Sequence, residues 1–125
     1  MKKILILGFC LFAAGCAQLQ AITTVASATV TPTEAIITAN AFNAVKSGAT
    51  AFLTYCVSTP ADNSCSADNR RKVISYVRSG TAARNQIETY ITSGGTSIPS
   101  AIYNTLVIAI NSLKATPAAN YTGVQ

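Results

Sequence analysis

The stretch Tyr55–Cys65, YCVSTPADNSC, decides how this chain folds, because it is a turn with a cysteine near each end. Its proline, aspartate and asparagine residues form turns and bring the two flanking segments together. Cys56 and Cys65 then form an even pair, which indicates a disulfide in a domain outside the cytoplasm. A redox pair is the alternative, but such pairs are typically Cys-X-X-Cys. A structural disulfide is therefore the favoured interpretation, and closing so short a loop contributes about 2.5 kcal/mol.

The segment before this turn carries the signals of a long helix. Thr31 and Glu34 match a capping box, and Pro32 stands at the first helical position. Apolar residues then recur at steps of three and four up to about Tyr55, which predicts one apolar stripe. The stripe consists of Phe42, Val45, Ala49, Phe52, Leu53 and Cys56. Gly48 interrupts it, and we expect this glycine to admit a close helix neighbour.

The segment after the turn predicts a second helix, from Ser66 to about Thr92. Its apolar stripe consists of Val73, Tyr76, Val77, Gly80, Ala83, Ile87, Tyr90 and Ile91. Gly94 and Gly95 follow, and glycine is common just beyond a helix end. A kink is expected near Gly80.

A third helix is expected from about Pro99 to Leu113, where apolar residues again recur at helical steps. The run LVIAI at 106–110 is apolar on all sides, so this helix is either the most buried of the three or has a second face for a partner. Three amphipathic helices with short connections predict an all-α fold, a small antiparallel three-helix bundle over 31–117. The tail 118–125 is expected to be loose.

The N-terminal segment matches a secretory signal peptide. Two lysines follow Met1, and an apolar run of about half the length of a membrane span extends from Ile4 to Ala14. The run ends in Ala13-Ala14-Gly15-Cys16, small residues followed directly by a cysteine. An ordinary cysteine beside a plain signal peptide is the alternative to the interpretation that follows.

These residues resemble the lipobox of bacterial lipoprotein signals, with Ala13 where that family often has leucine. The resemblance covers residues 1–16 alone. It implies that segment 1–15 is removed and that Cys16 receives the lipid, which anchors the protein durably in a membrane. In enterobacterial lipoproteins an aspartate after the cysteine favours the inner membrane. This chain has Ala17, so the resemblance implies the outer membrane, facing the periplasm.

Residues 16–30 are expected to form a lipidated tether. Ala17 to Val30 contains no charge and no helix-start signal, and a flexible coil of this length spans about 20 Å. Its threonines and valines leave open that part of it forms a strand.

Composition excludes several functions. The chain has no histidine, so a Ser-His-Asp triad and a His-bearing zinc site are excluded. Its four acids form no obvious pair, so we expect no enzyme, no cofactor and no metal site. Without segment 1–15 the formal charge is about +3, too weak for a nucleic-acid binder, and no binding module is recognisable.

The densest charge cluster is DNRRK at 68–72. Arg70, Arg71 and Lys72 occupy the start of the second helix, where the helix dipole disfavours cations. An anionic partner is one explanation: an acidic envelope protein, anionic lipid headgroups or lipopolysaccharide phosphates. The other is a solvated face partly neutralised by Asp62 and Asp68.

The sequence thus predicts a small lipoprotein that is anchored to a membrane in the periplasm. We expect a non-enzymatic binding or structural module of the cell envelope. The alternative is an exclusion or lysis lipoprotein of a phage or mobile element, which shares only this general format.

Overall fold

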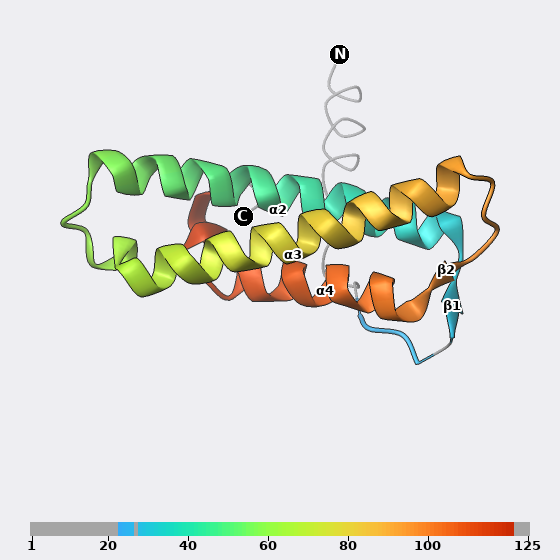
Figure 1. The fold of residues 1–125 in the computed structure, drawn as a ribbon. Helices are drawn as coiled ribbons and strands as arrows, with labels where there is room; N and C mark the ends of the chain where they lie inside the picture. Colours follow the sequence, from blue (N-terminus) through green and yellow to red (C-terminus); the bar gives the residue numbers. More distant parts are fainter. Residues whose placement is uncertain (1–22, 27, 122–125) are drawn as a thin grey trace, which may run out of the picture.

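Three long helices run antiparallel in the computed structural model, which describes residues 23–26 and 28–121 (Figure 1). The all-α class and the antiparallel three-helix bundle predicted from the sequence are confirmed. The helices are α2 (Pro32–Ser58), α3 (Ala67–Thr92) and α4 (Ser100–Lys114). Shorter elements join and flank them, namely the strands β1 (Thr29–Val30) and β2 (Ile98–Pro99) and the 3-10 helices η1 (Asn63–Cys65) and η2 (Pro117–Tyr121).

The starts of α2 and α3 follow from local capping, whereas α4 begins after Pro99 without a side-chain cap. The Thr31 hydroxyl accepts the backbone N–H of Glu34 at 3.3 Å, and the Glu34 carboxylate accepts the N–H of Thr31 at 3.2 Å. Ser66 caps α3 by accepting the N–H of Asn69 at 3.3 Å. The ends of α3 at Thr92 and of α4 at Lys114 agree with the prediction to within one residue, whereas α2 continues to Ser58 rather than stopping near Tyr55.

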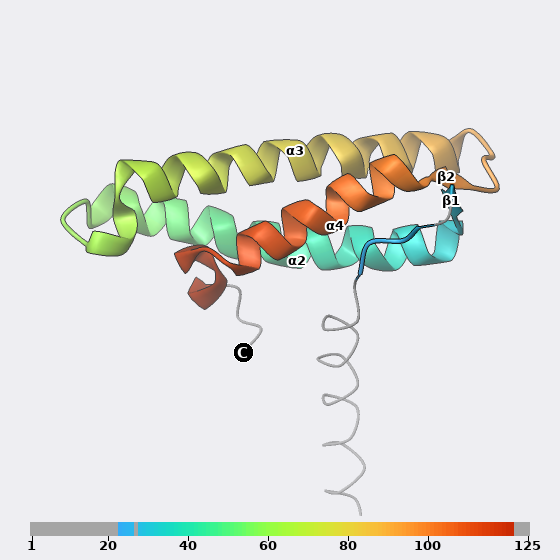
Figure 2. The ribbon, with the colours of Figure 1, turned by 90° about the horizontal axis from the view of Figure 1, so that it is seen from below.

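Helix α4 is the most buried of the three. Six of its 15 residues are buried, against four of 26 in α3. In the run 106–110 only Ile108 is exposed, at 57%. Of the two alternatives for this run, the structure supports the first, that this helix is the most buried of the three. Helix α4 packs against both other helices (Figure 2), and its buried residues belong to the shared core.

A close neighbour is shown at Gly80 of α3, a position for which the sequence suggested only a kink; Gly48, where it was expected, is buried in α2. A Cβ atom at Gly80 would overlap the ring of Phe42 from α2 and approach the Cβ of Ala109 from α4 to 2.9 Å. Helix α3 continues through this position without a break, which also differs from the expected kink. Gly80 is thus the point where all three helices meet.

The expected tether is partly docked on the bundle. Thr29 and Val30 pair antiparallel with Pro99 and Ile98, and Val30 is 4% exposed. Part of this segment is thus a strand, which is the alternative that the sequence left open. It shortens the free part of the predicted tether 16–30, of which 16–22 lies outside the described residues.

The start of the described chain is held by a single side chain of α4. The amide of Asn104 accepts the N–H of Val25 at 2.9 Å and donates to the carbonyl of Val25 at 3.1 Å. One asparagine therefore satisfies both backbone groups of Val25, as a neighbouring strand would do.

The tail is not loose over residues 118–121. These residues belong to η2, which packs against α2, and Ala118 is 2% exposed. The ring of Tyr121 lies 5.6 Å from that of Phe52 and 5.4 Å from that of Tyr55, measured between centroids. Aromatic packing of this kind stabilises the segment beyond its buried area. Residues 122–125 lie outside the described range.

Candidate functional site

The predicted lipidation residue, Cys16, and the segment 1–15 lie outside the described residues. Among the helices that are described, none has the length and hydropathy needed to cross a membrane.

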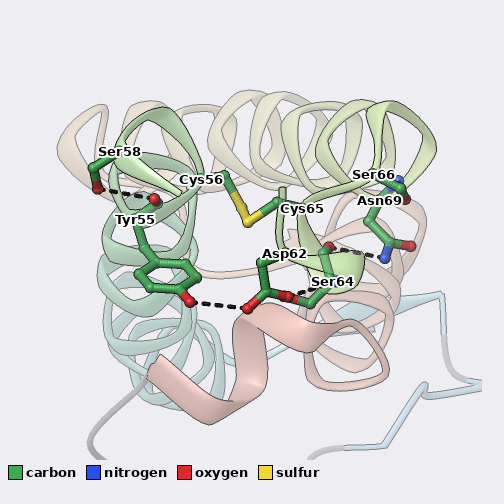
Figure 3. The surroundings of a disulfide bond; sticks show 8 residues. All are labelled: Tyr55, Cys56, Ser58, Asp62, Ser64, Cys65, Ser66 and Asn69. Atoms are coloured by element: carbon green, nitrogen blue, oxygen red, sulfur yellow. Dashed lines mark hydrogen bonds between the residues drawn. A yellow bond between two sulfur atoms is a disulfide. The ribbon is translucent and has the colours of Figure 1, made fainter. Parts of the chain in front are cut away.

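The predicted disulfide between Cys56 and Cys65 forms at one end of the bundle (Figure 3). Its sulfur atoms are 2.02 Å apart and its Cα atoms 5.2 Å apart. The two residues are 1% and 2% exposed. Because a redox-active cysteine has to be reachable by its substrate, this burial favours the structural role over the redox alternative.

The loop between the two cysteines is organised around Asp62. Its carboxylate accepts the backbone N–H of Ser64 at 2.8 Å, the Ser64 hydroxyl at 2.7 Å and the Tyr55 hydroxyl at 2.9 Å (Figure 3). The bonds from Ser64, and then that from Tyr55, hold the pKa of Asp62 below its ordinary value. The bond to Asp62 raises the pKa of Tyr55. Asp62 therefore organises this loop, and the structure shows no ion pair between it and the basic cluster.

The basic cluster lies in the first turns of α3, directly after the disulfide. Arg70, Arg71 and Lys72 are all exposed. Lys72 is paired with Asp68 at 2.7 Å, and this hydrogen-bonded contact lowers the pKa of Asp68 and raises that of Lys72. Among the residues described, Arg70 and Arg71 form no ion pair. Neutralisation by Asp68 thus accounts for one cation of the three.

A further arginine extends the cluster along the outer side of α3. Arg71 and Arg78 each stand two residues before a buried position, Val73 and Gly80. Two residues turn a helix by about 200°, so both arginines point away from the core. Ile74, 37% exposed, lies between them on the same side. We call these three residues the outer α3 face.

Each of the four acids has its own partner in the structure. Glu34 caps α2, Asp62 organises the disulfide loop, Asp68 pairs with Lys72, and Glu88 pairs with Arg84 at 2.7 Å. Within residues 23–26 and 28–121, no three acid or cysteine side chains are grouped so that they could hold a metal ion.

A shallow groove between α2 and α3, of about 280 Å³, was not expected from the sequence. Ile36 and Ile91 contribute apolar walls, and Asn43 a polar one. The two charged side chains that line it, Arg84 and Glu88, neutralise each other. The groove therefore presents an apolar surface with amide groups and carries no net charge.

Asn104 is the residue with a specific role that the sequence analysis missed. It lies between apolar residues of α4 and is partly buried, where an amide needs hydrogen-bond partners. That polar residue inside an apolar run was the available signal. Its partner, Val25, could not be found from the pattern, because 79 residues separate the two.

Compared with known proteins, the chain matches no family model, no curated protein and no solved structure.

Proposed function

We propose that this protein is a lipoprotein held through Cys16 in the outer membrane, facing the periplasm. Its helical bundle acts there as a non-enzymatic binding or structural module of the cell envelope. The observation that carries the proposal is the sequence Ala13-Ala14-Gly15-Cys16 at the end of a short apolar run that follows two lysines.

Two features of the bundle support the proposal. The buried disulfide suits an oxidising compartment such as the periplasm, where such bonds persist. The acids cap a helix, organise a loop or pair with a cation on the same helix. Arg70, Arg71 and Arg78 are exposed and form no ion pair among the described residues, so they can contact another molecule. This distribution suits a protein that binds rather than one that catalyses.

Mass spectrometry of the mature protein, combined with density-gradient separation of the two membranes, tests the anchor. We expect the wild type in the outer-membrane fraction, with diacylglycerol and an amide-linked acyl chain on residue 16. Cys16→Ser should release the protein from the membrane, whereas the matched variant Cys10→Ser should behave as the wild type. A Cys16→Ser protein that is processed and still sediments with the membrane would contradict the proposal.

Site-specific crosslinking in cells tests the binding role. A photoreactive residue at Ser75, on the exposed side of α3, should capture a neighbour in the wild type. The capture should be lost when Arg70, Arg71 and Lys72 are changed to alanine. If the triple variant captures the same neighbour equally well, the basic cluster takes no part in binding.

A further inference from the structure

The outer α3 face combines two arginines that form no ion pair among the described residues with an apolar residue between them. Arg71 and Arg78 are exposed, and neither forms an ion pair within the described part of the chain. Ile74 lies between them, and Arg70 adds a third unpaired cation at one edge. Arginine is one of the residue types that most often dominate the binding energy of protein interfaces.

This face lies on the side of the bundle away from the start of the described chain. The Val25 segment is bonded to Asn104 of α4, and strand β1 contacts α4 and β2. Figure 2 shows this segment on the side of α4 that faces away from α3, and Figure 1 shows α2 at the opposite edge of the bundle. Any anchor that precedes residue 23 is therefore joined to the bundle on its α4 side.

The length of chain before Thr23 limits how far the bundle can turn. Cys16 and Thr23 are seven Cα steps apart, so the connection reaches about 25 Å at most. Two helix layers with their side chains are about 20 Å thick. Laying the outer α3 face on the bilayer would need almost all of that reach merely to pass around the bundle. The short connection therefore disfavours contact between this face and the membrane that carries the anchor.

We propose that the outer α3 face is the docking surface for an acidic surface of another envelope protein. The inference rests on the proposed anchor at Cys16 and names the partner's chemistry. Charge complementarity selects an acidic partner, and the short connection disfavours lipid headgroups as the source of the negative charge. Ile74 supplies the apolar contact that a protein surface can match.

Binding of a fluorescent poly-glutamate peptide tests this assignment. The lipidated protein is placed in vesicles that contain phosphatidylglycerol and, separately, in uncharged phosphatidylcholine vesicles, and the Cys16→Ser protein serves as the soluble form. Arg71→Gln with Arg78→Gln should weaken binding by about tenfold in both forms, as expected when two exposed charge pairs are lost. The control Lys46→Gln with Arg84→Gln removes the same charge from other surfaces and should change binding by less than about twofold.

Three results would overturn the assignment. The first is an equal loss of binding in the control variant, which would show that net charge alone attracts the peptide. The second is unchanged binding in the double variant, which would show that the peptide does not contact the outer α3 face. The third is binding that disappears on phosphatidylglycerol vesicles but persists on uncharged ones, because the membrane would then occupy the face. If Cys16 carries no lipid, the proposed function fails instead, and the soluble protein still decides the use of the face.

Discussion

The two ends of the bundle hold the connection between neighbouring helices by different interactions. At the stapled end, where α2 turns into α3, a covalent bond joins Cys56 to Cys65 and hydrogen bonds to Asp62 order the loop. At the strand end, where α3 turns into α4, β1 and β2 pair over two residues each. The turn there uses Gly94 at a φ of +82°, a conformation that glycine adopts without strain.

The difference teaches how each end resists opening. A disulfide acts mainly by restricting the unfolded chain, so one bond has a large effect. A hydrogen bond exchanges a protein partner for water, and its net contribution is about 1 kcal/mol. We therefore expect the strand end to open more readily than the stapled end.

The largest effect is expected midway between the ends. Gly80→Val should destabilise the protein by about 3 kcal/mol, because the added atoms would overlap Phe42 and Ala109. Urea unfolding followed by circular dichroism measures this loss. The matched control Ser79→Val puts the same side chain at an exposed position of α3 and should cost well under 1 kcal/mol. A loss in Gly80→Val no larger than that in Ser79→Val would show that the close packing at Gly80 contributes little, because helix propensity alone favours valine over glycine.

Removing the staple should have the next largest effect. Cys56→Ala with Cys65→Ala is expected to cost about 2.5 kcal/mol and to lower the melting temperature by about 10–20 °C. Thermal unfolding measures it, with Val57→Ala, at an 80% exposed neighbour, as the control. A double variant that melts with the wild type would remove the contrast between the ends.

Releasing the N-terminal segment should have a smaller and more local effect. Asn104→Ala removes both hydrogen bonds to Val25 and should cost about 1–2 kcal/mol. Hydrogen exchange should become faster in Val25 and β1 while the stapled end stays protected. The exposed Asn111→Ala in the same helix is the control. Faster exchange spread evenly over both ends would contradict the idea that they open separately.

The smallest effect concerns acid. The folded protein holds the pKa of Asp62 below its ordinary 3.8, so this carboxylate stabilises the fold above that pH. That contribution is lost as the pH falls through the lower folded value. Asp62→Asn should therefore flatten the pH dependence of stability below about pH 4, and Tyr55→Phe should do so partially. An unchanged acid limb in Asp62→Asn would show that the loop bonds do not persist in solution.

The contrast between the ends also explains what the sequence could predict. Residue identity revealed the stapled end, because an even cysteine pair around turn formers has few interpretations. Helix starts were equally visible, since Thr31 and Ser66 act on neighbours a few positions away. The pairing of Val25 with Asn104, the docking of Tyr121 and the close contact at Gly80 depend on residues far apart in the chain. No local pattern encodes such contacts.

The same reasoning applies to the candidate site. The sequence located Arg70, Arg71 and Lys72, but it could not show which of them were already paired. The sequence left open whether Asp62 and Asp68 neutralise the cluster, and the structure shows an ion pair of Asp68 with Lys72. Burial of Val73 and Gly80 fixes the phase of the helix and places Arg71 and Arg78 on its outer side. The candidate binding site therefore lies along the outer side of α3 and not only at its first turns.

The nine-residue separation of Cys56 and Cys65 bears on the order of events during synthesis. Their contact is local, whereas Tyr121 must travel back across more than sixty residues to reach Phe52 and Tyr55. If the chain is exported amino end first, as the proposed function implies, the hairpin of α2 and α3 emerges before α4 does. In the complete fold both cysteines are buried. We therefore expect the disulfide to form before the core is complete. A thiol that is still reduced at that stage would be buried and inaccessible to an oxidant.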